Sequence, residues 1–571
     1  MKKVIKTAYT IAELKALTPG TEENSFFIVD RFQEGWFFYD PNDFESEDNI
    51  GTVIVSNSGA RFKRKFSGAV NVKWFGAVGD GTTDDTLAIQ NALRWRGAVE
   101  FPKAEYVVTD TIMLSDDTHI VGNHSTIRCR GNGIDVFYGF KVCEVTIDNL
   151  VLHDESGTNT AFYFEGTAEG RYLDYSRRIR LNDVKINEFH LGFRANYARQ
   201  WFLNNCFIYS RNGVLIENKS VEINITDTII YGSTEPQPTT FGVKMVHTDT
   251  HPSKYPEGVM ISGCTIDHYE RSIWIEDIFV FQLTNSFVAS TMESGEASLY
   301  FGKGTSTHIM DHTISNTVFW GKPILFHGHA QEPVHYHAVI SNCVFEYIDG
   351  PNLALQRNAQ DVSVSGCSFY TNPDLQSVVA ELSGDNALVR LSNFTTDPYF
   401  KGGIQVRGER SDVTIRDFDY YGEHRALELE QPVYLKNVTG RPDDFSIIEY
   451  SRRSAGIPHA VPFSPGEEIA KVTMNVARGQ RGIVRISGTV KPESEGVLLT
   501  VKHPSGIVFP SGPDWSSAMI PLSGDDQRLD AAIPFHCTRS VSGEFMLCND
   551  SSSEAAVSFG KHSWMSVQLE E

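Results

Sequence analysis

A short motif recurs nine times between residues 181 and 396, and this repeat constrains the fold more than any other feature of the chain. Its copies include LNDVKI, LNNCFI, ISGCTI and ISNCVF, each with two β-type pieces joined by one corner residue. Asn, Asp or Gly fills every corner, and these residues adopt a left-handed backbone at low cost. The corners lie 22 to 36 residues apart, at Asp183, Asn205, Asp227, Gly263, Asn285, Asn316, Asn342, Gly366 and Asn393.

A third apolar piece follows each motif after a loop of variable length, as in GVLIE from Gly213 and SIWIE from Ser272. Apolar residues alternate within the pieces, which excludes a coiled coil or a helical solenoid. Three short strands per turn with one sharp corner predict an all-β fold, a right-handed parallel β-helix. Each coil of such a helix buries its inner residues by stacking on its neighbours.

The residues after the corners predict what faces inward and outward. The first position after a corner is small, and we expect an inward stack of reduced thiols and hydroxyls there rather than a disulfide framework. It holds Cys206, Thr228, Cys264, Ser286, Thr317, Cys343 and Cys367. The second position points outward and holds Phe207, Ile229, Phe287, Val318 and Val344, with Thr265 and Ser368 interrupting. An outward apolar stripe predicts a subunit interface, or alternatively a surface covered by a loop of the same chain.

Charge and hydropathy exclude some classes of protein. Among 571 residues, 50 Lys and Arg oppose 72 Asp and Glu, so the formal net charge is −22. An acidic chain of this kind is not expected to bind nucleic acid. No run of 18 apolar residues is present, so we expect no membrane insertion. The first residues lack the apolar core and cleavage site of a signal peptide, so we expect mature protein.

The chain divides into four predicted parts. Residues 1–70 form a small N-terminal region with a short helix at Thr10–Leu17, and residues 71–100 form a helical cap that starts the β-helix. Thr83, Asp84 or Asp85 is expected to cap that helix, and GDGTTDDT reads as a turn rather than a calcium or phosphate loop. Residues 101–445 form the β-helix, and residues 455–571 a C-terminal β-sandwich, for trimerisation or carbohydrate binding.

Two segments carry a family resemblance. VNVKWFGAVGDGTTDDTLAIQNAL (70–93) resembles the start of a pectate-lyase-like β-helix, as found in bacteriophage tailspikes, and residues 35–66 resemble the N-terminal region of such tailspikes. The resemblance implies a homotrimer in the virion tail that cleaves bacterial capsular or O-antigen polysaccharide. Because the segment before the β-helix is short, we expect it to attach to another phage tail protein. The family shares no catalytic motif, and we expect neither cofactor nor metal.

In pectate-lyase-like helices the substrate groove follows the third strands, so their outward residues are the candidates for binding sugar. Alternation predicts one outward column with Arg194, Lys244, Trp274 and Tyr300, and a second with Glu217, Glu276 and His327. Trp274 can stack on a sugar ring, and Lys244 and Arg194 can bind a uronate or a pyruvyl group.

Glu217 and Glu276 are candidates for inverting endo-glycoside hydrolysis. They lie two coils apart in one column, so their backbones are about 9.6 Å apart at roughly 4.8 Å per coil. Side-chain tilt can bring the carboxyl groups into the inverting range of about 6.5–9.5 Å. Asp277 beside Glu276 is a further catalytic candidate, because the two could approach the shorter retaining separation.

Two other functions stay open. A polysaccharide lyase would use Lys244 or Arg194 against a uronate, with Tyr300, His327 or Lys244 as the base. A non-catalytic carbohydrate-binding adhesin is the second alternative. Loops 247–258 and 289–297 are expected to wall the groove in each case. The spacing of HTDTH in the first loop invites a zinc site, but a flexible loop lacks the fixed geometry that zinc requires.

Overall fold

The computed structural model describes the N-terminal region and most of the solenoid continuously, and the C-terminal part in segments. The described residues are 9–19, 25–168, 174–232, 239–249, 255–291, 293–302, 310–328, 334–385, 387–408, 412–422, 426–429, 434–439, 452–456, 468–476, 481–492, 497–502, 507–508, 517–522, 527–537, 541–549, 557–559 and 564–569. The chain divides into two compact units, residues 1–324 and 325–571.

A small antiparallel sheet with one helix forms the N-terminal region. Its strands run in the order β1 (Ser25–Ile28), β2 (Gly35–Asp40), β4 (Arg61–Arg64) and β3 (Val53–Val55). The predicted helix is present as α1 (Ile11–Ala16), and Thr10 and Glu13 form a reciprocal capping box at its start. One face of the sheet and the helix bury a shared core of Leu14, Phe26, Ile28, Phe37, Ile54 and Phe62.

The segment predicted to form the cap and to start the β-helix contributes both a helix and short parallel strands. These elements are β5 (Val70–Asn71), the 3-10 helix η1 (Val72–Phe75), β6 (Asp80–Asp84), α2 (Thr86–Leu93) and β7 (Ala98–Glu100). Asp85 stands at the helix start but makes no capping bond. Its carboxylate instead accepts hydrogen bonds from the backbone of Val78 and Gly79.

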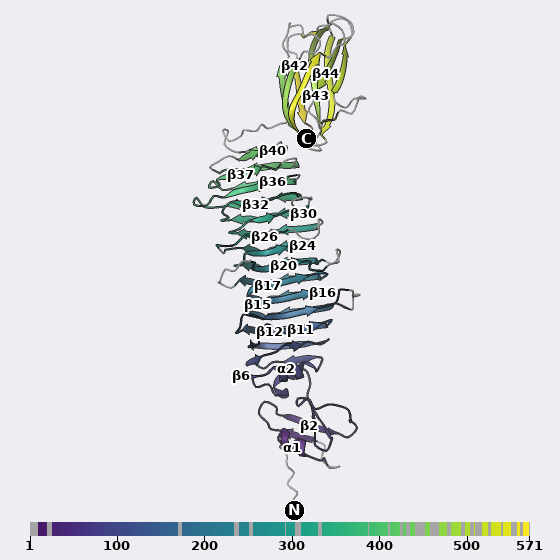
Figure 1. Ribbon diagram of the computed structural model, residues 1–571, viewed down its shortest axis with the longest axis vertical. Helices are drawn as coiled ribbons and strands as arrows, with labels where there is room; N and C mark the ends of the chain where they lie inside the picture. Colours follow the sequence, from purple (N-terminus) through teal and green to yellow (C-terminus); the bar gives the residue numbers. More distant parts are fainter. Residues whose placement is uncertain are drawn as a thin grey trace, which may run out of the picture. The chain divides into compact units, whose positions relative to one another are not determined.

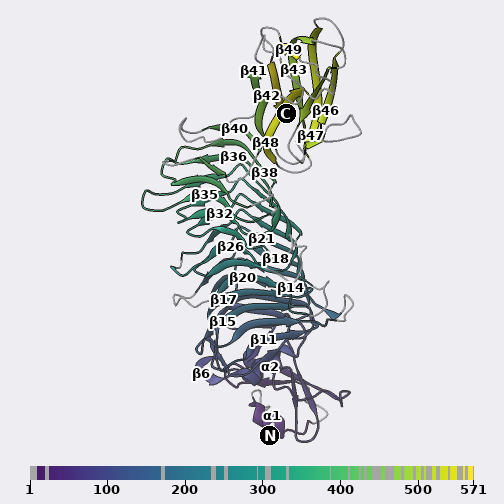
Figure 2. The same cartoon turned by 45° about the horizontal axis from the view of Figure 1, so that its top comes forward.

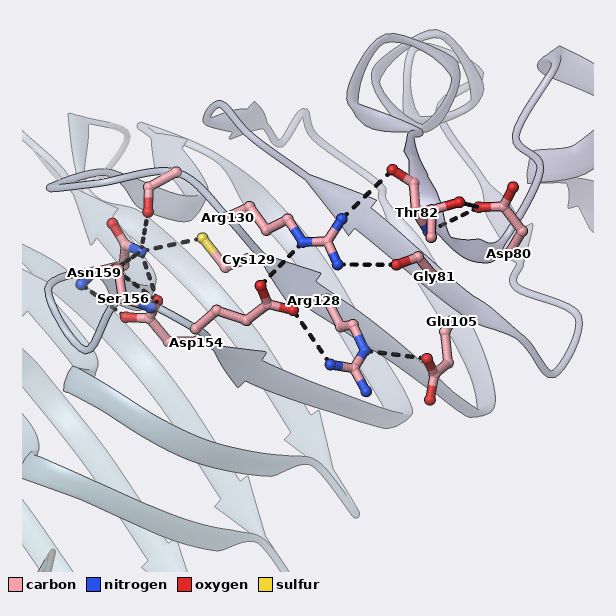
Figure 3. A network of polar contacts seen from close by, with 12 residues as sticks. Asp80, Gly81, Thr82, Glu105, Arg128, Cys129, Arg130, Asp154, Ser156 and Asn159 are labelled. Atoms are coloured by element: carbon pink, nitrogen blue, oxygen red, sulfur yellow. Dashed lines mark hydrogen bonds and ion pairs between the residues drawn. The ribbon is translucent and has the colours of Figure 1, made fainter.

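The GDGTTDDT segment contains the short strand β6 and leads into α2, and Arg130 ties it to the first coils (Figure 3). Asp80 accepts hydrogen bonds from the backbone of Thr82 and Thr83. Arg130 donates to the carbonyl of Gly81 at 3.1 Å and to the Glu155 carboxylate at 3.0 Å. Arg128 joins Glu155 to Glu105 of β8 (Glu105–Val108), the strand that pairs with β10 (His119–Cys129) one coil earlier. Asp80 is thus bonded within its own segment, but most of the segment predicted to be a turn is the strand β6.

Each coil contributes three strand types, and strands of one type pair in parallel from coil to coil (Figures 1 and 2). In Figure 2, β14, β18 and β21 follow one side of the solenoid and β20 and β26 another. The strands up to the unit boundary are β8 (Glu105–Val108), β9 (Ile112–Met113), β10 (His119–Cys129), β11 (Asp135–Phe140), β12 (Cys143–Asp154), β13 (Thr160–Glu165), β14 (Ser176–Asn182), β15 (Lys185–Asn196), β16 (Ala198–Asn204), β17 (Phe207–Glu217), β18 (Val221–Thr226), β19 (Ile229–Gly232), β20 (Phe241–Val246), β21 (Glu257–Ser262), β22 (Thr265–Asp267), β23 (Arg271–Ile275), β24 (Phe279–Thr284), β25 (Phe287–Ala289), β26 (Ala297–Phe301), β27 (Met310–Ser315), β28 (Val318–Trp320) and β29 (Ile324–Phe326).

The corners confirm the repeat. All nine predicted corner residues have φ between 50° and 67°, in the left-handed region. The cysteines that follow a corner are buried and free, as predicted. The outward position after them pairs in register from Phe207 through Ile229, Thr265 and Phe287 to Val318. Phe207 is 36% exposed and Ile229 43%.

The second unit continues the same strand pattern and ends in antiparallel sheets. Its parallel strands are β30 (Val334–Ser341), β31 (Val344–Glu346), β32 (Pro351–Leu355), β33 (Ala359–Ser365), β34 (Ser368–Tyr370), β35 (Val378–Leu382), β36 (Leu388–Thr396), β37 (Gly402–Val406), β38 (Asp412–Asp419), β39 (Leu427–Leu429) and β40 (Tyr434–Thr439). The predicted end of the β-helix at residue 445 lies outside the described residues.

Two antiparallel sheets form within the part predicted to be a sandwich. One contains β41 (Arg452–Gly456), β43 (Arg481–Pro492), β45 (Ile507–Val508), β47 (Gln527–Cys537), β49 (Val557–Phe559) and β50 (Trp564–Leu569). The other contains β42 (Glu468–Val476), β44 (Val497–Lys502), β46 (Ser517–Leu522) and β48 (Val541–Asn549).

Candidate functional site

The third strands of the first unit carry the predicted face, here called the third-strand face. Its first outward column runs Tyr163, Arg194, Leu215, Lys244, Trp274 and Tyr300, and its second runs Glu165, Asn196, Glu217, Val246 and Glu276. The intervening residues are fully buried, among them Val214, Ile216, Val243, Met245, Ile273 and Ile275. The predicted alternation and register are therefore confirmed for these coils.

Arg194 and Glu217 form a close ion pair across neighbouring coils. The Nε of Arg194 donates to Oε2 of Glu217 at 2.6 Å. The Glu217 side chain is 8% exposed, whereas that of Arg194 is 36% exposed and lies 4.5 Å from the ring of Tyr163. Burial disfavours the charged guanidinium, but the Glu217 hydrogen bond and charge outweigh it and raise the pKa of Arg194. Arg194 thus neutralises and orients the predicted carboxylate.

Lys244, Trp274 and Glu276 meet on adjacent coils. The Nζ of Lys244 lies 3.5 Å from the centre of the Trp274 ring and 3.6 Å from Oε1 of Glu276. Burial is the main cause of a lowered pKa of Lys244, and the nearby Arg271 adds to it. The Glu276 side chain is 27% exposed, so it is more accessible than Glu217. A cation already lies over the ring that was predicted to stack on sugar.

Arg271 is a residue of this face that the sequence reasoning missed. Its guanidinium carbon lies 4.0 Å from the centre of the Trp274 ring and 4.2 Å from that of Tyr300. Its Nε and Nη2 pair with Glu296, which comes from the predicted wall loop 289–297. Arg271 begins a third strand, where simple alternation does not identify an outward side chain. An arginine three residues before an outward tryptophan was the available signal.

The remaining predicted residues are less accessible or lie elsewhere. Tyr300 contacts Trp274 edge to face at 6.0 Å and is nearly buried. Asp277 is also buried, so it does not join Glu276 on the exposed face. His327 follows β29 in the second unit and is half-buried. The face therefore brings together Arg194 with Glu217, and Lys244 with Trp274, Tyr300 and Glu276.

The face extends further toward the N-terminus than predicted. Tyr138 pairs in register with Tyr163, and its hydroxyl donates to Oε2 of Glu165 at 2.6 Å. Burial raises the pKa of Tyr138, and the Glu165 hydrogen bond raises it further. Burial also raises the pKa of Asp135 at the start of the same strand. The segment AFYFE (161–165) has the pattern of the later third strands, and this was the sequence signal for the extension.

The first predicted wall loop starts with an anchored segment. The Oδ1 of Asn218 accepts hydrogen bonds from the backbone of Thr248 and Asp249, both at 2.9 Å. Asp249 in turn accepts a hydrogen bond from the Tyr197 hydroxyl. Residues 250–254, which include His251 of the HTDTH segment, lie outside the described residues.

No group of three His, Cys, Asp or Glu side chains with the arrangement of a metal site occurs among the described residues. No helix in this part of the chain is long and apolar enough to cross a membrane.

Two family models match consecutive parts of the chain. Residues 7–67 match the "Phage tail protein small four-stranded beta-sheet domain", in agreement with the observed sheet β1-β2-β4-β3. Residues 69–235 match "Rhamnogalacturonase A/epimerase, pectate lyase-like". Together they confirm the resemblance to phage tail proteins with a pectate-lyase-like right-handed β-helix.

Curated relatives match only over short stretches. The Mu-like prophage FluMu defective tail fiber protein of Haemophilus influenzae is 36% identical over 147 residues, covering 23% of each chain. Plasmin and fibronectin-binding protein A of Streptococcus pneumoniae is 35% identical over 95 residues, covering 15% of this chain and 12% of the relative. The matches thus span less than a quarter of the length of either relative.

Among solved structures, tailspike protein 2 of the Escherichia coli O157:H7 bacteriophage CAB120 is 13% identical with a TM-score of 0.45. That alignment covers 99% of this chain and 80% of the tailspike.

Proposed function

We propose that this phage tail protein is a tailspike depolymerase that binds a bacterial surface polysaccharide along the third-strand face and cleaves it. A capsular polysaccharide is the first choice of substrate and O-antigen the second. Cleavage would give the virion access to the host cell. The phage-tail sheet domain at residues 7–67 would attach the protein to another tail protein, and the chain would act as a homotrimer.

The observation that carries the proposal is the position of Glu217 and Glu276. They share one outward column with a single residue, Val246, between them. Two coil spacings put their backbones about 9.6 Å apart, which suits two carboxyl groups on either side of a glycosidic bond and a water. Aromatic and cationic side chains flank them in the neighbouring column, as a sugar-binding face requires.

We assign inverting hydrolysis to this pair. Glu217, held by Arg194, accepts the proton of the attacking water, and Glu276, the more exposed of the two, donates a proton to the leaving oxygen. The bond from the anomeric carbon to that oxygen breaks as the bond to water forms. Arg194 holds the Glu217 carboxylate in one orientation before substrate binds, so little free energy is needed to orient it during the reaction.

A second route, β-elimination, is favoured by one observation. Burial lowers the pKa of Lys244, so a larger share of its amine is neutral than for an exposed lysine. A neutral amine can take the proton beside a uronate carboxylate, after which the bond to the leaving oxygen breaks, a double bond forms in the sugar, and the leaving oxygen takes a proton from the lysine ammonium or from water. This route makes Lys244 the base and leaves Glu217 without a role.

Purified full-length protein incubated with a panel of capsular polysaccharides tests the proposal. New reducing ends without ultraviolet absorbance of an unsaturated sugar support hydrolysis, whereas both signals together support elimination. Under hydrolysis, Glu276→Gln and Glu217→Gln should each lower turnover by about 100-fold or more. Glu257→Gln, on a first strand and paired with Lys219, is the matched control. Turnover that survives loss of both glutamates contradicts their assignment, and binding without product supports the adhesin.

A further inference from the structure

Three side chains on the third-strand face have donor groups that the described residues do not fully satisfy. Lys244 Nζ carries three hydrogens, and Oε1 of Glu276 at 3.6 Å is the one acceptor near it in this part of the chain. Arg271 directs Nε and Nη2 to Glu296, and its Nη1 has no partner in the described part of the chain. Trp274 Nε1 is buried and likewise unpaired there.

The same residues hold these donors in one place. The Arg271 guanidinium lies within 4.2 Å of the centres of the Trp274 and Tyr300 rings, and Lys244 lies over Trp274 as well. Both cationic side chains are mostly buried, with 16% of Arg271 and 19% of Lys244 exposed. Buried donors without acceptors and two close cations each cost free energy. A bound acceptor with a negative charge would offset both costs.

The local charge balance limits what that acceptor can be. Glu276 and Glu296 already supply two negative charges beside Lys244 and Arg271. A singly charged ligand therefore fits better than a phosphate dianion. A carboxylate is planar, and it can accept two parallel hydrogen bonds from a guanidinium whose plane is held by aromatic rings.

We propose that Arg271, Lys244 and Trp274 form a subsite for a carboxylate carried by the polysaccharide, as on a uronate or a pyruvylated sugar. The substrate is therefore an acidic polysaccharide. The inference rests on the proposed function, because that function places a polysaccharide on this face. Under hydrolysis all three residues bind the carboxylate; under elimination Lys244 would act as the base, and Arg271 and Trp274 would bind the carboxylate without it.

Because the net charge of the chain is −22, binding of an acidic polysaccharide depends on this subsite. An acidic chain repels an acidic polymer at long range, and only short contacts with desolvated cations can reverse that repulsion. Recognition then depends on a few residues, and removing one of them should be measurable.

Full-length protein labelled with 5-fluorotryptophan provides the test, with sodium glucuronate and glucose as probes that differ in one carboxylate. The Trp274 fluorine resonance is assigned by its loss in Trp274→Phe. We expect glucuronate to shift this resonance and glucose to leave it in place. Arg271→Gln should weaken the glucuronate response by about tenfold or more. Lys63→Gln, which removes a cation from the N-terminal sheet, should not change it.

Three results would overturn the subsite: an equal shift with glucose, no shift with either sugar, or a glucuronate response that Arg271→Gln leaves unchanged. None of these readouts requires cleavage. If no polymer in the panel gives a product, the proposed depolymerase activity is contradicted. A shift with glucuronate alone would still support the subsite in that case. Cleavage of neutral polymers alone would support the depolymerase activity and contradict the carboxylate subsite.

Discussion

At the scale of single residues, each of the two carboxylates assigned to catalysis lies beside a cation. Arg194 contacts Glu217 closely, whereas Lys244 stands further from Glu276 and closer to an aromatic ring. The first pair is a fixed, nearly buried unit. The Lys244–Glu276 pair is looser, so both side chains can still contact a substrate. For this reason proton donation is assigned to Glu276 and ligand binding to Lys244.

The lowered pKa of Lys244 predicts how the stability of the protein changes with pH. The unfolded chain binds a proton on this lysine up to its ordinary pKa of 10.5, but the folded protein releases it at lower pH. Charging Lys244 therefore costs folding free energy below the folded pKa, and this cost disappears as pH rises toward 10.5.

Lys244→Met should consequently stabilise the protein relative to the parent at neutral pH and lose that advantage in the alkaline range. Unfolding in guanidinium chloride across pH, compared between parent and variant, measures the difference. Lys219→Met, at a more exposed ion pair, should show no such trend. An advantage that is constant with pH would contradict the role of burial.

At the scale of elements, the corner between the first and second strands fixes the register of every coil. Asn205 donates a hydrogen bond to Asp183 one coil below, so corner side chains also contact each other. At Gly263 a Cβ atom would lie 2.4 Å from Oδ1 of Asp227, and at Gly366 it would lie 2.6 Å from Oδ1 of Asn342. A side chain at these two corners would therefore make the Asp227 or Asn342 side chain of the neighbouring coil rotate away, in addition to requiring positive φ.

Substitutions at the corners should separate the two requirements. Asn285 has φ 51°, so Asn285→Gly should change the free energy of unfolding by less than about 0.5 kcal/mol, and Asn285→Val should lower it by about 1–2 kcal/mol. Gly263→Ala should cost more than Asn285→Ala, because it adds the clash with Asp227. Equilibrium unfolding in guanidinium chloride gives the free energy of unfolding of each of the four variants. Equal costs for the two alanine variants would contradict the steric argument.

The inward thiols give a second prediction at this scale. Burial raises the pKa of Cys206 to about 12 and that of Cys264 to about 11, so neither carries much thiolate at neutral pH. Iodoacetamide at about pH 8 should modify the half-buried Cys143 first and spare both inward residues until the protein unfolds. Peptide mass spectrometry of the alkylated protein reads this order. Early modification of Cys206 in folded protein would mean that the coils open locally.

At the scale of the whole molecule, the outward apolar column is the basis for expecting a trimer. Phe207 and Ile229 remain exposed within one chain, and they continue in register with Phe287 and Val318. An apolar stripe of this kind is stable in water when another surface covers it.

Ile229→Lys should therefore convert the assembly to monomers, because a charge in a closed apolar interface costs several kcal/mol per subunit. Size-exclusion chromatography with light scattering measures the mass. Met260→Lys changes an exposed apolar residue outside the column and should leave the trimer intact. A parent protein that is already monomeric would refute the assembly, and the third-strand face would then have to act within one chain.

The sequence by itself determined the solenoid and its register. Left-handed corners favour Asn, Asp or Gly, and strands with one buried face require apolar and polar residues to alternate. Both requirements recur in every coil, so both appear in the sequence as a repeat. That periodicity located the corners, the inward cysteines and the outward columns that carry Arg194, Glu217, Lys244, Trp274 and Glu276.

Only the tertiary structure decided which side chains meet on that face. Arg271 precedes the outward position but reaches over Trp274 and Tyr300, and Glu296 arrives from a loop of the next coil. Asp277 is buried although it follows the partly exposed Glu276 directly. Side chains at strand ends and in loops escape the two-residue alternation, because their directions depend on the turn geometry and on the neighbouring coil. The cations, rings and carboxylates of the face are therefore paired by packing between coils.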